Sequence, residues 1–169
     1  MNKDLYEKYA NYYIDKFKDS PRLIVSKKWV TEDILHIAIY TKLPSFEFFM
    51  GIFPNMILFD GICVCDQGID FDDIEKVNKN EIFAFLDNEA NIILNYIENG
   101  LFLFAYQNAD KVVSMSTNVT DRKKLFENFD IEKFYNEQTT PKEPDFERLT
   151  KIELLDFYGD VVYEYSRDN

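Results

Sequence analysis

The spacing of apolar residues changes twice along this chain, and each change marks a boundary between helical and extended structure. Over residues 3–18 the apolar side chains recur every three or four positions, which is typical of one face of a helix. After Pro21 they alternate, as over residues 34–41, which is typical of a half-buried strand. Near Asn80 the helical spacing returns and continues to residue 99. The chain therefore places helices and strands in separate runs, a pattern that predicts an α+β fold.

The extended runs are separated by short breaks, and short breaks favour antiparallel hairpins over crossover connections. The candidate strands of one sheet cover residues 34–41, 46–53, 56–65, 101–106, 111–116 and 161–165, with residues 23–30 as a further candidate. We predict an antiparallel sheet of five or six strands, with an N-terminal helix over 3–18 and a central helix over 80–99 packed on it. Residues 82–86 also fit a strand.

The last part of the chain combines a capping signal with a linker-like stretch. Thr150 and Glu153 have the spacing of a capping box and predict a short helix that ends at Gly159. Residues 139–144 resemble a linker but are short. A chain of 169 residues suits one domain, so we predict a single domain over residues 1–169 that needs no metal or disulfide to form its core.

The charge balance excludes several classes of partner. The 19 basic and 31 acidic residues give a net charge of −12, which disfavours nucleic acid and anionic membrane surfaces. The longest apolar stretch, residues 48–59, contains Pro54 and is shorter than the roughly 20 residues of a membrane helix. The first seven residues show no apolar segment of a signal peptide. We expect a cytoplasmic protein that does not bind nucleic acid or membranes.

The negative charge is concentrated in the middle of the chain. Residues 43–110 hold 12 acidic and 2 basic residues, and no Lys or Arg occurs between Lys42 and Lys76. Within this interval, five carboxylates fall in the ten residues 66–75. The segment fits three interpretations: a solvated loop, an irregular cation site, or a docking surface for a basic protein. An EF-hand is excluded, because counting from Asp66 puts Gly68 at position 3 instead of position 6.

We expect the contact with a basic partner to lie at this segment, with Phe71 as an aromatic that supplies affinity. The candidate partner-binding residues are Asp66, Asp70, Phe71, Asp72, Asp73 and Glu75.

Residues for catalysis or metal binding are few. His36 is the only histidine, and it lies in a candidate strand. Cys63 and Cys65 cannot complete a four-ligand Cys/His zinc site with it, and we expect both to be buried, reduced thiols. The chain contains no phosphate-binding glycine motif, no H-E-x-x-H and no G-x-S-x-G. We therefore expect no catalytic residue, no cofactor and no metal, and we expect that the protein is not an enzyme.

In its size, its lack of an export signal and its acidic segment 66–75, the chain resembles bacterial immunity proteins, which neutralise the toxin domains of contact-dependent growth inhibition and other polymorphic toxin systems. The resemblance implies tight binding over or beside the active site of a cationic toxin domain, often a nuclease. One alternative is a DNA mimic or regulatory binding module of mobile-element origin, although the mixed charge of residues 3–18 argues against a whole-surface mimic. Another alternative is an enzyme with an unrecognised carboxylate site.

Overall fold

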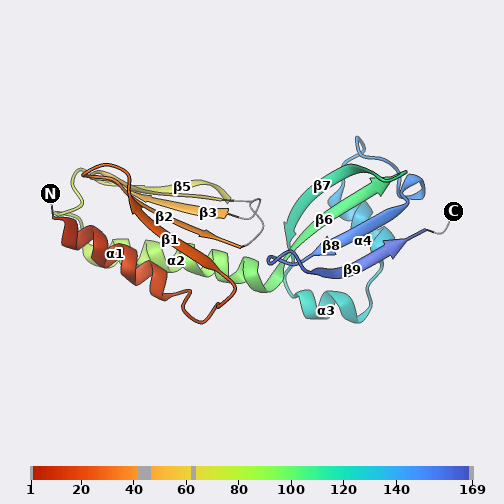
Figure 1. The fold of residues 1–169 in the computed structure, drawn as a ribbon, viewed down its shortest axis with the longest axis horizontal. Coiled ribbons are helices and arrows are strands. Elements are labelled where there is room, and N and C mark those ends of the chain that lie inside the picture. The colour runs from red at the N-terminus through yellow and green to blue at the C-terminus, as the bar shows by residue number, and fades with distance from the viewer. Residues whose placement is uncertain (1, 42–46, 62–63, 168–169) are drawn as a thin grey trace. The chain divides into compact units, whose positions relative to one another are not determined.

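The computed structural model describes residues 2–41, 47–61 and 64–167 (Figure 1). The chain divides into two compact units, Met1–Leu94 and Asn95–Asn169. Helix α2 (Lys79–Asn99) runs without a break through the boundary between them. Each unit combines helices with one antiparallel sheet.

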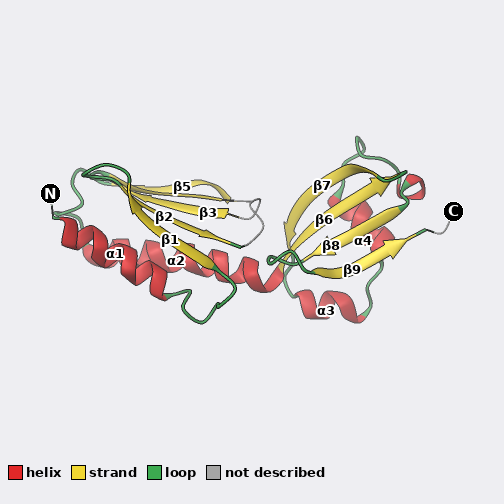
Figure 2. Cartoon of the chain, viewed as in Figure 1, coloured by secondary structure: helices red, strands yellow, loops and turns green. Residues whose placement is uncertain are grey.

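The first unit is an antiparallel meander of five strands, and α1 and the first part of α2 lie along one face of it (Figures 1 and 2). Each strand pairs with the next in the sequence, so the order is β1-β2-β3-β4-β5. The elements before α2 are α1 (Lys3–Asp15), β1 (Ile24–Trp29), β2 (Leu35–Tyr40), β3 (Glu47–Ile52), β4 (Met56–Gly61) and β5 (Val64–Asp70).

Buried and half-buried residues alternate along the strands, and the buried residues form the core of this unit. On β2, Leu35, Ile37 and Ile39 are at most 1% exposed, whereas the residues between them are half-buried. The buried side of α1 contributes aromatic rings, and Tyr9 packs edge-on against Phe83 of α2 at 5.4 Å between ring centroids. Apolar burial of this kind is the main stabilising contribution to a small unit.

Polar contacts join α1 to α2 at the rim of this core. The carboxylate of Asp87 accepts a hydrogen bond from the Tyr12 hydroxyl (2.8 Å) and forms an ion pair with Lys16 (2.6 Å). Lys16, followed by Tyr12, lowers the pKa of Asp87 below its usual value, so the carboxylate stays charged at neutral pH.

The second unit has a four-stranded antiparallel sheet in the order β7-β6-β8-β9. Its elements after α2 are β6 (Gly100–Gln107), β7 (Asp110–Asn118), α3 (Arg122–Glu127), α4 (Ile131–Gln138), a 3₁₀ helix (Phe146–Arg148), β8 (Lys151–Leu155) and β9 (Val161–Ser166). The core contains Leu101 and Leu103 of β6, Ile152 and Leu154 of β8, and Phe134 of α4. The tight β6–β7 turn requires positive φ angles, 50° at Asn108 and 72° at Ala109.

The α+β class, the antiparallel pairing and both expected helices are confirmed. The N-terminal helix ends at Asp15, and residues 82–86 belong to α2 rather than to a strand. The strands predicted over 101–106, 111–116 and 161–165 belong to a second sheet, because β7 and β8 occupy the two edges of β6. The division into units leaves the prediction of one domain over residues 1–169 untested, since α2 is continuous.

The short helix expected after Thr150 is wrong, because residues 151–155 form β8. Ile152 and Leu154 are fully buried, while the residues on either side of each are half-buried. This two-residue alternation, which buries one face against the core, overrides the local capping signal.

A carboxyl group is buried in the first unit. Glu89 of α2 is 0% exposed, and its Oε2 has no hydrogen-bond partner among the described residues. Burial raises the pKa of Glu89 above its usual value, and the hydrogen bond that Asn88 donates to Oε1 (3.1 Å) opposes this only in part. The fold therefore favours the protonated form of this side chain.

We expect Glu89 to make stability depend on pH. Because its folded-state pKa is raised, the stability of the folded state is highest below the unfolded value and falls as pH rises toward the folded value. Glu89→Gln removes this dependence. As pH rises, the free energy of unfolding of the wild type should fall, relative to that of the variant, by about 1.4 kcal/mol for each pH unit by which the folded-state pKa is raised. Urea denaturation between about pH 5 and about pH 8 measures the difference. Glu98→Gln, an exposed position on the same helix, is the control; parallel curves for Glu89→Gln and wild type would contradict the expectation.

Candidate partner-binding site

The acidic segment predicted from the sequence forms the end of β5 and the turn that follows it. Asp70 is the last residue of β5 and lies opposite Met56 of β4. Asp66 lies further back on β5, and its side chain is outside the described residues. The other predicted residues, Phe71, Asp72, Asp73 and Glu75, follow the strand directly. Five of the six predicted residues thus lie in one stretch of the chain, residues 70–75, which we call the acidic turn.

The acidic turn is fixed to the turn between β3 and β4. The amide of Phe71 donates to the carbonyl of Asn55, and the amide of Ile74 donates to the carbonyl of Pro54, both at 2.9 Å. Ile74 is only 2% exposed, so its side chain anchors the turn in the core. This attachment holds the carboxylates at a defined place on the first unit.

One carboxylate stabilises the acidic turn itself. Asp73 accepts a hydrogen bond from the amide of Glu75 and forms an ion pair with Lys76, each at 2.9 Å. Lys76 and then the Glu75 amide lower the pKa of Asp73 below its usual value. Asp73 is half-buried and has a structural role, which distinguishes it from the other acids of the turn.

The remaining acids of the turn face solvent. Asp70, Asp72 and Glu75 are exposed, and Phe71 is half-buried. Within the part of the chain that the structure describes, the side chains of Asp70 and Asp72 have no hydrogen bond or ion pair. Glu75 accepts a hydrogen bond from the amide of Asn2 at 2.8 Å. The turn therefore presents two exposed carboxylates, Asp70 and Asp72, that no described side chain pairs with.

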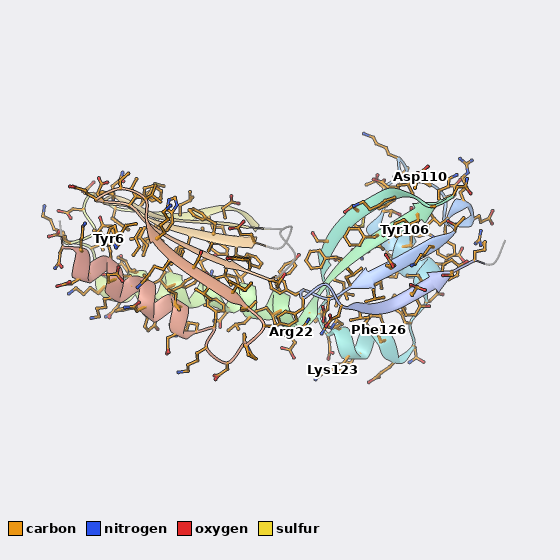
Figure 3. The ribbon with its side chains drawn as sticks, viewed as in Figure 1. Tyr6, Arg22, Tyr106, Asp110, Lys123 and Phe126 are labelled. Atoms are coloured by element: carbon orange, nitrogen blue, oxygen red, sulfur yellow. The ribbon has the colours of Figure 1, made fainter. Side chains whose placement is uncertain are left out.

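An open hollow of about 420 Å³ lies beside the acidic turn. It is lined by Tyr6, Asp33, Pro54, Asp73, Ile74 and Glu75. Tyr6 comes from α1 (Figure 3), Asp33 from the polar turn between β1 and β2, and Pro54 from the turn between β3 and β4. With the acidic turn, four segments of the sequence meet here. Sequence spacing gave no signal for Tyr6 or Asp33 as part of this site, because only the pairing of the meander brings them to the acidic turn.

The hydroxyl of Tyr6 lies within the field of these carboxylates. Tyr6 is 0% exposed, and its hydroxyl has no hydrogen-bond partner among the described residues. Burial raises the pKa of Tyr6, and the charges of Asp33, Glu75 and Asp73 raise it further. The hollow thus combines three acidic side chains with an unpaired hydroxyl.

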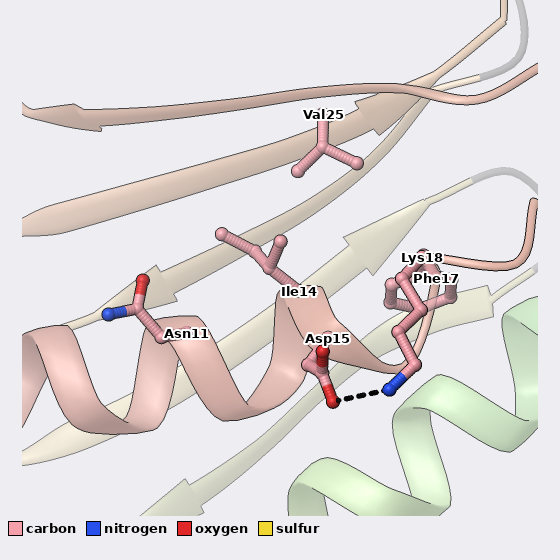
Figure 4. A pocket seen from close by; sticks show the side chains of 6 residues that line it. All are labelled: Asn11, Ile14, Asp15, Phe17, Lys18 and Val25. Carbon is pink, nitrogen blue, oxygen red and sulfur yellow. Dashed lines mark hydrogen bonds and ion pairs between the residues drawn. The ribbon is translucent and has the colours of Figure 1, made fainter. Parts of the chain in front are cut away.

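A second hollow of the first unit, about 240 Å³, has a different character. It lies between the end of α1 and β1 and is lined by Asn11, Ile14, Asp15, Phe17, Lys18 and Val25 (Figure 4). Its two charged residues, Asp15 and Lys18, form an ion pair with each other at 3.2 Å. With its charges paired, this hollow offers no excess of either sign to a charged ligand.

Of the residues that could take part in catalysis, the structure describes the surroundings of His36. His36 lies on β2 with its ring edge-on to Phe49 at 4.4 Å, and burial lowers the pKa of His36. Cys63 and the side chain of Cys65 lie outside the described residues, so the expectation of buried thiols stays a prediction. An aromatic neighbour, rather than a carboxylate or thiol, is the contact that the structure shows for His36.

A charged network on the second sheet has a structural character. Lys151 of β8 forms ion pairs with Glu153 (2.8 Å) and with Glu164 of β9 (3.0 Å), and the Tyr106 hydroxyl donates to Glu153 (2.8 Å). Lys151 and then Tyr106 lower the pKa of Glu153, whereas Glu153 and then Glu164 raise the pKa of Lys151. Lys151 and Glu153 are thus held in their charged forms, which does not suit proton transfer near neutral pH.

Metal-ligating clusters and membrane-spanning helices are absent from residues 2–41, 47–61 and 64–167. No group of three or more His, Cys, Asp or Glu side chains there is arranged to hold a metal ion. None of the helices in that part of the chain combines the length and the apolar content needed to cross a lipid bilayer.

Comparison with known proteins leaves the site to be interpreted from its own geometry. No protein-family model matches the chain, and no curated protein or solved structure matches it.

We expect Ile74 to be the residue that holds the acidic turn in place. Ile74→Ala removes three carbons from a buried position and should lower the free energy of unfolding by about 2–5 kcal/mol, as measured by urea denaturation. Val77→Ala, at a half-buried position just after the turn, is the matched control and should cost less. Equal losses for the two variants would show that Ile74 is not a specific anchor.

Proposed function

We propose that this protein binds a basic protein through the acidic turn, and that it acts in the cytoplasm as an immunity protein that neutralises a toxin domain. The observation that carries the proposal is the exposure of Asp70, Asp72 and Glu75 on a turn that buried Ile74 fixes to the sheet. Fixed, exposed charges of one sign attract a partner of opposite sign before contact and thereby accelerate association.

The partner class follows from charge and from the resemblance to immunity proteins. A nuclease domain must attract phosphate, so its active-site cleft is basic, and an acidic turn can enter such a cleft. Like charges close together in the free protein repel one another, and a cationic partner relieves this repulsion. Phe71, half-buried beside these charges, is placed to add apolar contact.

The proposal is tested by capture of a partner from the host with three forms of the protein. The site variant carries Asp70→Asn, Asp72→Asn and Glu75→Gln, and leaves Asp73 in place because it stabilises the turn. The control variant carries Glu98→Gln, Glu127→Gln and Glu147→Gln, three exposed positions in the second unit. Both variants change the net charge equally, so they differ only in where the charge is removed.

We expect the wild type and the control variant to capture the same basic protein and the site variant to lose it. With the purified partner, the site variant should associate about tenfold more slowly at low salt, and added salt should remove the difference. Co-expression of the partner should arrest growth unless the wild-type protein is present. A partner that both variants capture equally, or that is acidic, would contradict the proposal.

A further inference from the structure

The hollow beside the acidic turn has the composition of a site for a cationic side chain. Three of its six lining residues are carboxylic acids, Asp33, Asp73 and Glu75, contributed by two different turns. Lys76 pairs with Asp73, and its side chain is 83% exposed. The residues that line the hollow thus include three acids and no Lys or Arg.

The second observation is the hydroxyl of Tyr6. A hydroxyl that is buried without a partner has lost its hydrogen bonds to water and gained none in exchange, which costs about 1–3 kcal/mol. Tyr9 and Tyr13 on the same helix also have buried hydroxyls without a partner among the described residues, but only Tyr6 lines this hollow. A ligand that donates a hydrogen bond to Tyr6 would remove that cost.

We propose that this hollow receives the guanidinium group of an arginine side chain, and that the arginine belongs to the basic partner inferred above. The proposal rests on the proposed function and names the chemistry that the partner must present. In this arrangement Asp33 supplies negative charge and the Tyr6 hydroxyl accepts a hydrogen bond.

A guanidinium fits these groups better than a metal ion or an ammonium group. It carries five donors in one plane, so it can reach a carboxylate and a hydroxyl that lie in different directions. Asp33 uses its Oδ1 to accept a bond from Thr31 (2.6 Å), and its Oδ2 has no partner among the described residues. The carboxylates of the hollow are not grouped as metal ligands. Guanidinium is also more weakly hydrated than ammonium, which lowers the cost of entering a hollow.

The chain contains a reporter for this site. Trp29 is the only tryptophan, and its ring centroid lies 5.6 Å from that of Tyr6. Its indole Nε1 donates to Glu7 at 2.9 Å, which fixes the ring. The fluorescence of Trp29 should therefore respond when a charged group enters the hollow, without any label.

The test is a titration of the full chain with the blocked tripeptide acetyl-Gly-Arg-Gly-amide, followed by Trp29 fluorescence and by NMR shifts of the Ile74 and Glu75 amides. The same peptide with citrulline keeps the shape of the side chain and removes its charge, and the same peptide with lysine keeps the charge and removes the planar group. We expect saturable binding of the arginine peptide, and binding at least about tenfold weaker for both of the others.

Two variants with the same chemical change distinguish an effect on binding at the hollow from a general effect on stability. Tyr6→Phe and Tyr9→Phe each remove one buried, unpaired hydroxyl from α1. We expect Tyr6→Phe to weaken arginine binding about tenfold and Tyr9→Phe to leave it unchanged, with both variants melting at or above the wild-type temperature. Asp33→Asn should weaken binding as well.

Three results would overturn the proposal: equal binding of the arginine and citrulline peptides, equal binding of the arginine and lysine peptides, or equal effects of Tyr6→Phe and Tyr9→Phe. These results are independent of the capture experiment. If the arginine peptide fails to bind while the site variant still loses a basic partner, the hollow is not the arginine site and the proposed function stands. If the peptide binds specifically but no basic partner is captured, the arginine site stands and the proposed function is wrong.

Discussion

The burial of the tyrosine side of α1 is the interaction on which the first unit depends. Tyr6, Tyr9 and Tyr13 are at most 1% exposed, and their rings contact Trp29 of β1, Phe83 of α2 and Phe17 after the helix. One helix face therefore joins the sheet to α2. Because a tyrosine ring is large and amphipathic, this face gains much apolar contact but places three hydroxyls where the described residues provide no hydrogen bond.

This choice of residue connects stability with the proposed binding site. Phenylalanine at these positions would give the same apolar contact without buried hydroxyls, so the hydroxyls reduce the stability that the fold could reach. A residue that reduces stability is explained most simply where it has a use, and Tyr6 is the one of the three that lines a hollow with carboxylates. The acidic turn follows the same logic, since its four carboxylates lie close together in the sequence and like charges repel one another.

The sequence predicted most of the local structure and the position of the acidic turn, but not the site around it. Periodicity located α1, α2 and most strands, because their burial follows directly from alternating or helical spacing. It failed at β8, where a capping signal suggested a helix and tertiary packing produced a strand. It also could not separate two sheets, since strand pairing depends on which edges remain open. Tyr6 and Asp33 could not be linked to the acidic turn, because they lie 67 and 40 positions before Asp73 and meet it only after the meander has formed.

The continuity of α2 affects how the two units could be separated. The boundary at Leu94 falls inside a helix, and the Arg122 amide donates a hydrogen bond to the Asn99 side chain (3.2 Å), which ties the last turn of α2 to the start of α3. A recombination event or proteolytic cut at this point would leave broken helix ends with unpaired backbone groups. Separating the two units at this point would therefore require a new helix end on each of them.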